Sequence, residues 1–333
     1  VAPSHPDLEV VGVFNPAAAV VDGETMIVAR VAEAVADSGE GDQLSPCWME
    51  GKLQIDRVDT AAGCGDDPRK IEPSGGGTRL RFVSHLRAFY SEDGRTIDRE
   101  GQRWMPEGPL ETFGIEDPRL TVTDDGCRMT YVNVSRHGVA TSLMTCDGGQ
   151  AWERQGVIFC PENKDVVWLP ERINGRWVAI HRPSTSESFG PPAIWVAESE
   201  DGLAWGRHRP LARGEQPWEG ERIGAGPPPL AVEDGWLLMY HGSERPSGDQ
   251  PVGTYRAGLM LLDRDDPSRI LARTREPVLE PTETFEREGF VPDVIFPTGW
   301  VRDGDALRIY YGAADEHVGV LELQWTDVLS ALH

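Results

Sequence analysis

The chain has 333 residues, 39% of them hydrophobic, and carries 55 acidic against 32 basic side chains, which gives a formal net charge of −23. This excess of carboxylates argues against nucleic acid and anionic membranes as partners, because both require a net basic face. No apolar run approaches the roughly 18 to 20 residues that a membrane span needs, whereas 11 Trp, 9 Phe and 6 Tyr are enough to fill a core. We therefore expect a soluble, globular protein.

The cysteines and the first residues bear on the compartment. Cys47, Cys64, Cys127, Cys146 and Cys160 never form a Cys-x-x-Cys pair, so we expect neither a disulfide framework nor a structural zinc site. The opening VAPSHPDLEV has neither the basic nor the apolar region of a secretory signal. Together these features predict a cytoplasmic protein.

One hairpin pattern recurs five times along the chain: an alternating strand, a turn that ends in glycine, and a hydrophobic strand. In chain order the copies are AAAVVDGETMIVARV around Gly23, RLTVTDDGCRMTYVNV around Gly126, VVWLPERINGRWVAIHRP around Gly175, PPLAVEDGWLLMYHG around Gly235 and VIFPTGWVRDGDALRIYYG around Gly304.

The first four copies are each followed by a second strand and turn, and three of these turns contain Asp-Gly, at Asp93-Gly94, Asp147-Gly148 and Asp201-Gly202. The fifth continues as HVGVLELQWTDVL, which can supply an outer strand but lacks the turn. Five units of about four strands predict an all-β fold, a five-bladed β-propeller, formed by a single domain over residues 1–333. The segment 33–78, rich in Asp, Gly and Cys, is predicted to be an insertion in the first blade.

The first strand of every propeller blade lines the central axis, so the residues at the start of each first hairpin are expected to converge at one mouth of the channel. They are Asn15-Pro16, Glu116-Asp117-Pro118, Lys164-Asp165, Gly224-Ala225-Gly226-Pro227 and Val291-Pro292-Asp293. The prediction is a funnel that combines carboxylates with an amide and a lysine.

Two hydrophobic strands end in basic or imidazole groups, in IHRP at 180–183 and MYHGS at 239–243. If these strands are innermost, His181, Arg182, Tyr240 and His241 lie where the channel opens. Convergent Arg, Lys and His around one carboxylate suit an anion held beside a general acid. The alternative is that the carboxylates and cations neutralise one another as buried pairs.

These residues carry a family resemblance. The series FNPA, GIEDPRLT, NKDVVWLPERING, HRP, IGAGPPP, GWLLMYHG, YRAGLMLLDRDDPSRILART, VPDVIFPTG and YYGAAD, from about Phe14 to Asp315, resembles the mannoside phosphorylases of glycoside hydrolase family 130. The resemblance implies a five-bladed propeller, in agreement with the repeat count. It also implies inverting phosphorolysis of short β-mannosides, such as mannobiose, mannooligosaccharides or mannosyl-glucose, to α-mannose 1-phosphate.

Asp117, in GIEDPR, matches the family's catalytic acid, which is thought to deliver its proton through the mannose 3-hydroxyl. We expect burial beside Glu116 to keep this carboxyl protonated. A second carboxylate as base is unnecessary, because phosphate is itself the nucleophile, unlike the water of an inverting glycosidase.

The resemblance also assigns the remaining site residues. Its phosphate-binding positions fall on Lys164, Arg182, Arg222, His241 and Tyr255. Its sugar-binding positions fall on Asn15, Arg30 and Asp315, with Arg87 and Asp293 as further candidates. Arg119 is a candidate for the sugar or for an ion pair with Glu116. Two departures from the family pattern stand out: position 222 is commonly Lys and is Arg here, and VPNV is VPDV, which adds the carboxylate of Asp293.

Two alternatives remain open. A β-mannoside hydrolase of the same family would need a carboxylate base such as Glu219, Glu221 or Asp293. A non-catalytic glycan-binding propeller would stack sugars on Trp104, Trp168, Trp195 or Trp218.

For cofactors and partners, the sequence contains no H-x-x-x-H and no glycine-rich nucleotide loop, so no metal or organic cofactor is expected. The implied ligands are a β-mannoside and inorganic phosphate as co-substrate. Homo-oligomers are common in the family, which allows that assembly here.

Overall fold

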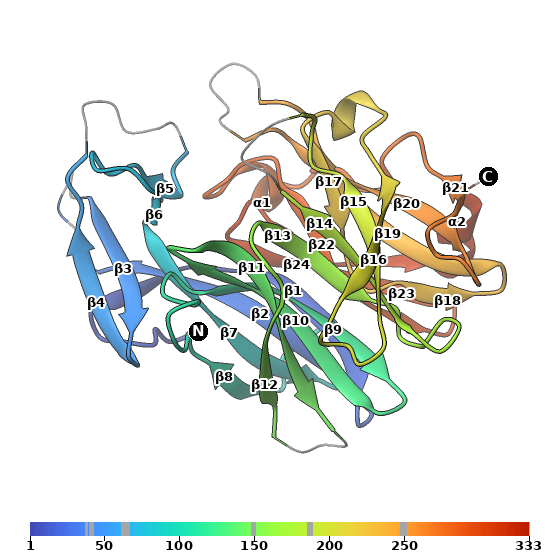
Figure 1. Cartoon of the computed structure of the whole chain (residues 1–333), viewed down its shortest axis with the longest axis horizontal. Helices are drawn as coiled ribbons and strands as arrows, with labels where there is room; N and C mark the ends of the chain where they lie inside the picture. The colour runs from blue at the N-terminus through green and yellow to red at the C-terminus, as the bar shows by residue number, and fades with distance from the viewer. Residues whose placement is uncertain are drawn as a thin grey trace.

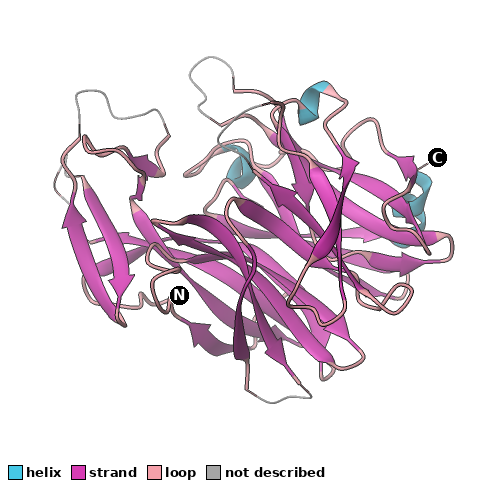
Figure 2. Cartoon of the chain, viewed as in Figure 1, coloured by secondary structure: helices cyan, strands magenta, loops and turns pink. Residues whose placement is uncertain are grey.

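A computed structural model describes residues 1–36, 39, 43–60, 67–147, 151–184, 189–246 and 252–332. Strands dominate these residues, as Figure 2 shows. The only helical elements in this part of the chain are η1 (Pro217–Glu219), α1 (Thr284–Arg287) and α2 (Trp325–Ser330). No helix among the described residues has the length and apolar character of a membrane span.

Five antiparallel sheets follow one another in chain order as blades, apart from two small hairpins, and this confirms the predicted five-bladed propeller (Figure 1). Blade I contains β1 (Leu8–Val21), β2 (Glu24–Val35), β7 (Phe82–Ser91) and β8 (Arg99–Trp104). Blade II contains β9 (Ile115–Thr123), β10 (Gly126–Ser135), β11 (Gly138–Cys146) and β12 (Glu153–Phe159). Blade III contains β13 (Asn163–Trp168), β14 (Trp177–Pro183), β15 (Ile194–Ser199) and β16 (Gly206–Ala212).

The last two blades depart from the four-strand pattern. Blade IV splits its inner strand into β17 (Arg222–Ala225) and β18 (Leu230–Val232), which both pair with β19 (Gly235–Ser243), followed by β20 (Tyr255–Asp263) and β21 (Ile270–Arg273). Blade V has three described strands, β22 (Ile295–Asp303), β23 (Ala306–Ala313) and β24 (His317–Gln324). The sequence predicted that this last repeat lacks the turn to a further outer strand.

The predicted hairpin turns lie where the repeat placed them. All five turn glycines have positive φ, which L side chains rarely adopt: Gly23, Gly126, Gly175, Gly235 and Gly304. Gly94 and Gly202, in the second turns, share this conformation, whereas Gly148 lies outside the described residues.

The five largest hydrophobic clusters of the described residues form layers, one between each pair of neighbouring blades. Strand β19 is buried on both faces: Leu238 and Tyr240 pack toward blade III, whereas Leu237 and Met239 pack toward blade V. Alternate side chains of a strand point to opposite faces, so a strand whose blade is packed between two others carries apolar side chains on both faces.

The ring closes without a strand shared between the first and last blades. The Val13 amide of blade I donates to the Glu316 carbonyl (2.9 Å), and the Thr298 hydroxyl of blade V donates to the Pro16 carbonyl (2.9 Å). β1 thereby contacts both β9 and β22.

The inserted segment interrupts blade I between β2 and β7. It carries two separate hairpins, β3 (Leu44–Met49) with β4 (Lys52–Arg57), and β5 (Lys70–Ile71) with β6 (Arg79–Leu80), at the left edge of Figure 1. Because β2 continues to Val35 and β6 still belongs to the inserted hairpins, the insertion spans 36–81 instead of the expected 33–78.

Candidate active site

The inner strands bend where the predicted site residues occur. Asn15, Asp117 and Asp165 adopt left-handed φ values of 48°, 48° and 54°, at or beside irregularities in the pairing of β1, β9 and β13. Asn and Asp tolerate this conformation better than most residues, and a bulge re-aims the side chain it carries. All three side chains therefore face one pocket. Asp293 has the same conformation (φ 60°) but does not line that pocket.

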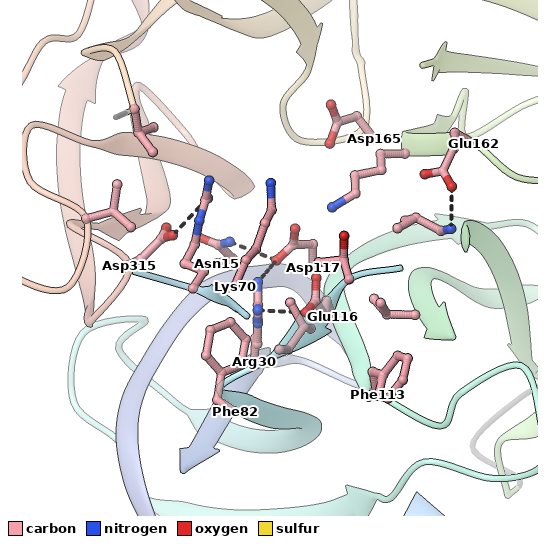
Figure 3. A pocket seen from close by; sticks show the side chains of 18 of the residues that line it. Asn15, Arg30, Lys70, Phe82, Phe113, Glu116, Asp117, Glu162, Asp165 and Asp315 are labelled. Carbon is pink, nitrogen blue, oxygen red and sulfur yellow. Dashed lines mark hydrogen bonds and ion pairs between the residues drawn. The ribbon is translucent and has the colours of Figure 1, made fainter. Parts of the chain in front are cut away.

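The pocket has a volume of about 630 Å³ and combines carboxylates, cations and aromatic rings (Figure 3). Its lining contains nine residues assigned from the sequence: Asn15, Arg30, Asp117, Lys164, Arg182, Arg222, His241, Tyr255 and Asp315. These come from all five blades, because Asp315 lies two residues after the end of β23.

Asp117 is held by a shared set of donors. The Asn15 Nδ2 donates to its Oδ1 (2.7 Å), and the Arg30 Nη1 donates to the same oxygen (3.2 Å). Arg30 also donates to Glu116 (2.7 Å) and to the Ser84 hydroxyl (3.0 Å). Glu116 is thus paired with Arg30, from the neighbouring blade.

These contacts correct the expected protonation of Asp117. Burial alone would raise the pKa of Asp117, but Arg30, Lys164 and the Asn15 hydrogen bond together lower it. Before ligands bind, Asp117 is therefore a carboxylate, and it is not kept protonated by burial beside Glu116.

The opposite carboxylate, Asp165, organises a second group of side chains. Its Oδ2 lies 3.1 Å from the Arg182 Nε and 3.4 Å from the His241 Nε2, and all three side chains are almost fully buried. Burial lowers the pKa of His241 to about 3, although Asp165 opposes the shift. His241 is therefore a neutral imidazole near neutral pH, next to the positive charge of Arg182.

Arg222 and Lys164 complete the cationic side of the pocket. Arg222 donates to Glu221 (3.0 Å) through Nη2, while its buried Nε has no hydrogen-bond partner among the described residues. Lys164 makes no ion pair within 4 Å in this part of the chain, and its charge contributes to lowering the pKa of Asp117. Arg182, Arg222 and Lys164 give the pocket the means to bind an anion next to a buried carboxyl.

Asp315 lies on the side of the pocket nearest the insertion. Burial raises the pKa of Asp315, and the neighbouring Asp117 and Glu116 add to the rise, while Arg69 and Arg30 oppose it. Arg69 places its Nη1 3.7 Å from the Asp315 Oδ2. Arg69 and Lys70 both line the pocket, and sequence reasoning missed them because the insertion lies outside the repeat.

Arg87 and Asp293 do not line the pocket. Arg87, on β7, pairs with Glu100 on the neighbouring outer strand. The backbone carbonyl of Asp293 instead accepts a hydrogen bond from the Tyr255 amide (3.0 Å).

Arg119, His181 and Tyr240 have structural roles different from those expected. Arg119 donates to the Gly226 carbonyl (2.7 Å), and it lies 3.8 Å from Asp165, so it is not the partner of Glu116. β14 and β19 are second strands, not innermost ones. Alternate side chains of these strands point to opposite faces, so Tyr240 packs between blades III and IV and His181 lines a separate hollow with Trp205 and His208, whereas the adjacent Arg182 and His241 line the pocket.

The carboxylates suggested as hydrolytic bases lie outside the pocket lining. Glu219 is fully buried, where it accepts hydrogen bonds from Tyr240 (2.6 Å) and Arg273 (2.8 Å). Glu221 pairs with Arg222. Of the tryptophans considered for sugar stacking, Trp104, Trp168 and Trp218 are buried in the core.

Comparisons with known proteins agree with this geometry. The family profile described as β-1,4-mannooligosaccharide phosphorylase, that of glycoside hydrolase family 130, matches residues 86–333. A β-1,2-mannobiose phosphorylase of Listeria innocua serovar 6a is 37% identical over 342 residues, covering 100% of this chain and 94% of the relative. A 1,2-β-oligomannan phosphorylase of Thermoanaerobacter sp. strain X514 is 37% identical, covering 74% of this chain and 81% of the relative.

A solved structure shows the same fold over the whole chain. It is the Listeria innocua β-1,2-mannobiose phosphorylase in complex with β-1,2-mannobiose, with a TM-score of 0.91 and 36% identity, covering 100% of this chain and 95% of that one. The profile spans well over half of the sequence, and the Listeria relative matches from end to end. The chain belongs to glycoside hydrolase family 130.

Proposed function

We propose that this protein is an inverting phosphorylase that cleaves a β-mannoside with inorganic phosphate to give α-mannose 1-phosphate. One observation carries the proposal: Asp117 and the three cations Lys164, Arg182 and Arg222 face the same pocket. The cations can hold a phosphate dianion against a protein background of net charge −23. The full-length relationship to a β-1,2-mannobiose phosphorylase supports the same reaction.

In the proposed step, a phosphate oxygen attacks the anomeric carbon while the bond to the glycosidic oxygen breaks. The proton of Asp117 passes through the mannose 3-hydroxyl to the departing oxygen, and this leaves Asp117 as a carboxylate. The mannose 1-phosphate monoanion can return the proton, so no outside acid is consumed. Asn15 and Arg30 hold Asp117 in place.

Ligand binding explains how the Asp117 carboxylate becomes protonated and can act as an acid. Lys164 and Arg30 lower the pKa of Asp117 in the free protein. A phosphate dianion bound beside Lys164 would offset the lysine charge, and a sugar would exclude water from the carboxylate. Both changes raise the pKa of Asp117, so the proton is taken up as the ternary complex forms.

We further propose that the β-1,2 linkage is the preferred one. Three relatives named as phosphorylases of β-1,2-linked mannosides are 36% to 37% identical to this chain, against 33% for a β-1,4-mannooligosaccharide phosphorylase. The β-1,2-mannobiose phosphorylase of Listeria matches the whole chain, including the inserted residues Arg69, Lys70 and Arg79 that line the pocket. Contacts beyond the cleaved bond distinguish linkages, so the relative that is aligned over all of these lining residues is the better guide.

The hydrolase alternative is weakened, because the carboxylates suggested as its base, Glu219, Glu221 and Asp293, do not line the pocket. The non-catalytic alternative is weakened by the burial of Trp104, Trp168 and Trp218. We also propose that the enzyme acts in the cytoplasm, because its five cysteines are odd in number and their spacing suggests no disulfide framework.

The test is to incubate the protein with β-1,2- or β-1,4-mannobiose, with and without phosphate, and to resolve the products by proton and phosphorus NMR. We expect phosphate-dependent α-mannose 1-phosphate from β-1,2-mannobiose, at a higher kcat/KM than from the β-1,4 isomer. Release of free mannose without phosphate would refute phosphorolysis. A preference for β-1,4-mannobiose would refute the linkage assignment alone.

A further inference from the structure

Arg69 reaches the active site from the insertion, not from a blade. It lies just before β5, and its backbone carbonyl accepts a hydrogen bond from the Arg81 amide (3.1 Å), which ties it to the segment beside β6. Its side chain lines the same pocket as Asp117 and Arg222. A residue outside the propeller therefore contributes a positive charge to the site.

Asp67 fixes the orientation of this guanidinium. Its two carboxylate oxygens accept from the Arg69 Nε (2.9 Å) and Nη2 (3.0 Å), and its Oδ1 also accepts from the Arg69 amide (3.0 Å). A bidentate pair of this kind holds a guanidinium in one plane. The third nitrogen, Nη1, is left to face the pocket.

The Nη1 group donates no hydrogen bond to any of the described residues. Its nearest carboxylate oxygen, on Asp315, is 3.7 Å away, beyond hydrogen-bonding distance. Burial would lower the pKa of Arg69, yet Asp67, Asp315 and Tyr255 outweigh it and raise the pKa. The guanidinium is therefore a permanent cation with an unused donor.

The surroundings of Arg69 indicate what this donor binds. Tyr255 is also the largest influence on the pKa of Arg222, and Arg69 acts on Arg222 as a nearby like charge. Arg69, Arg222 and Tyr255 line the same pocket, and the buried Nε of Arg222 has no hydrogen-bond partner in the described parts of the chain. Neighbouring cations with unused donors are satisfied by a polyvalent anion between them.

We propose that Arg69 is a phosphate-binding residue that the insertion supplies, that Asp67 positions it, and that it grips the phosphate together with Arg222. The same contact would hold the phosphoryl group of mannose 1-phosphate in the reverse reaction. This proposal rests on the proposed phosphorolysis for its kinetic consequences, but phosphate binding itself can be measured without turnover.

The direct test is calorimetric titration of inorganic phosphate into the wild-type protein and into Arg69→Ala, Arg69→Lys and Asp67→Asn. We expect Arg69→Ala to weaken phosphate binding by about 10-fold or more, as the loss of a charge-assisted hydrogen bond requires. Arg69→Lys should restore part of the affinity, because it keeps the charge but loses the fork. Asp67→Asn should weaken binding less than Arg69→Ala. Lys52→Ala is the matched control, since Lys52 is an exposed cation of the same insertion outside the pocket lining.

Kinetics separate a phosphate contact from a sugar contact. Arg69→Ala should raise the KM for phosphate and for mannose 1-phosphate by about 10-fold or more, and change the KM for the mannobiose by less than about 3-fold. A raised KM for mannobiose with unchanged phosphate affinity would overturn the proposal and assign Arg69 to the sugar. Unchanged affinity for both would also overturn it.

Two further outcomes remain decisive. If Arg69→Ala does not fold, as judged by circular dichroism, Arg69→Lys and Asp67→Asn carry the comparison. If the wild-type protein binds phosphate in an Arg69-dependent way but cleaves no β-mannoside, the proposed function fails and the assignment of Arg69 stands.

Discussion

Replacing Asp117 with Asn removes the proton and the charge of the proposed acid while keeping its shape. The amide oxygen can still accept hydrogen bonds from the Asn15 Nδ2 and the Arg30 Nη1, which lie 2.7 Å and 3.2 Å from the Asp117 Oδ1 in the wild-type protein. Arg30 also keeps its second carboxylate, Glu116. The substituted site should therefore retain its geometry and its affinity for the sugar.

The expected losses follow from these contacts. A positioned general acid contributes about 100- to 10,000-fold, which corresponds to about 2.7 to 5.4 kcal/mol at 1.36 kcal/mol per decade. The attraction between Arg30 and Asp117 at 3.2 Å is about 5 kcal/mol at an effective dielectric constant of 20. Most of it is offset, because a neutral amide avoids the cost of burying a carboxylate. We expect the free energy of unfolding to change by less than about 2 kcal/mol.

The assay compares two leaving groups at saturating phosphate. With β-1,2-mannobiose, Asp117→Asn should lower kcat/KM by the full factor above, because the departing sugar needs a proton. With 2,4-dinitrophenyl β-mannoside, whose leaving group needs no proton, the loss should be less than about 10-fold. Equal losses on both substrates, in a variant that melts like the wild-type protein, would refute the role of Asp117 as an acid.

Three further predictions follow from the packing around the site. Gly224→Ala should raise the KM for phosphate, because a Cβ there would meet the Asp165 carboxylate and lie 2.5 Å from the His241 Cε1, whereas Gly206→Ala, with open space around it, should not. His181→Asn should flatten the pH dependence of urea unfolding between pH 4 and 6. Burial and the neighbouring His208 lower the pKa of His181 to about 3 in the folded protein. Below about pH 6.5 the unfolded chain therefore takes up a proton that the folded protein does not, and the free energy of unfolding falls by up to about 1.4 kcal/mol for each pH unit of acidification. An unchanged slope would contradict this account. Tyr240→Phe should cost about 1 to 3 kcal/mol of stability in chemical denaturation, because it removes the donor to buried Glu219, and leave kcat/KM nearly unchanged; a large loss of activity would contradict its structural role.

Local sequence rules were sufficient for the architecture. Alternation, turn glycines and their repetition depend on neighbouring residues only, so five hairpins could be recognised and the missing outer turn of blade V was visible. Repetition also located part of the site, because the first three blades present the same position of their inner strands to the pocket. Asn15, Asp117 and Lys164 were found in this way.

Other features depended on residues that meet only in the folded chain. The protonation of Asp117 is decided by Arg30 and Lys164, which are contributed by other blades, so the expectation drawn from its neighbour Glu116 was wrong. The partner of Glu116 proved to be Arg30 instead of the adjacent Arg119.

The insertion shows the same limit most clearly. It has no periodicity that relates it to the blades, so nothing in its sequence indicates that Arg69 approaches Asp315. Periodic side chains report the fold because their environment repeats along the chain. A charge in a buried pocket responds to whatever surrounds it in space, and only the tertiary structure assembles those surroundings.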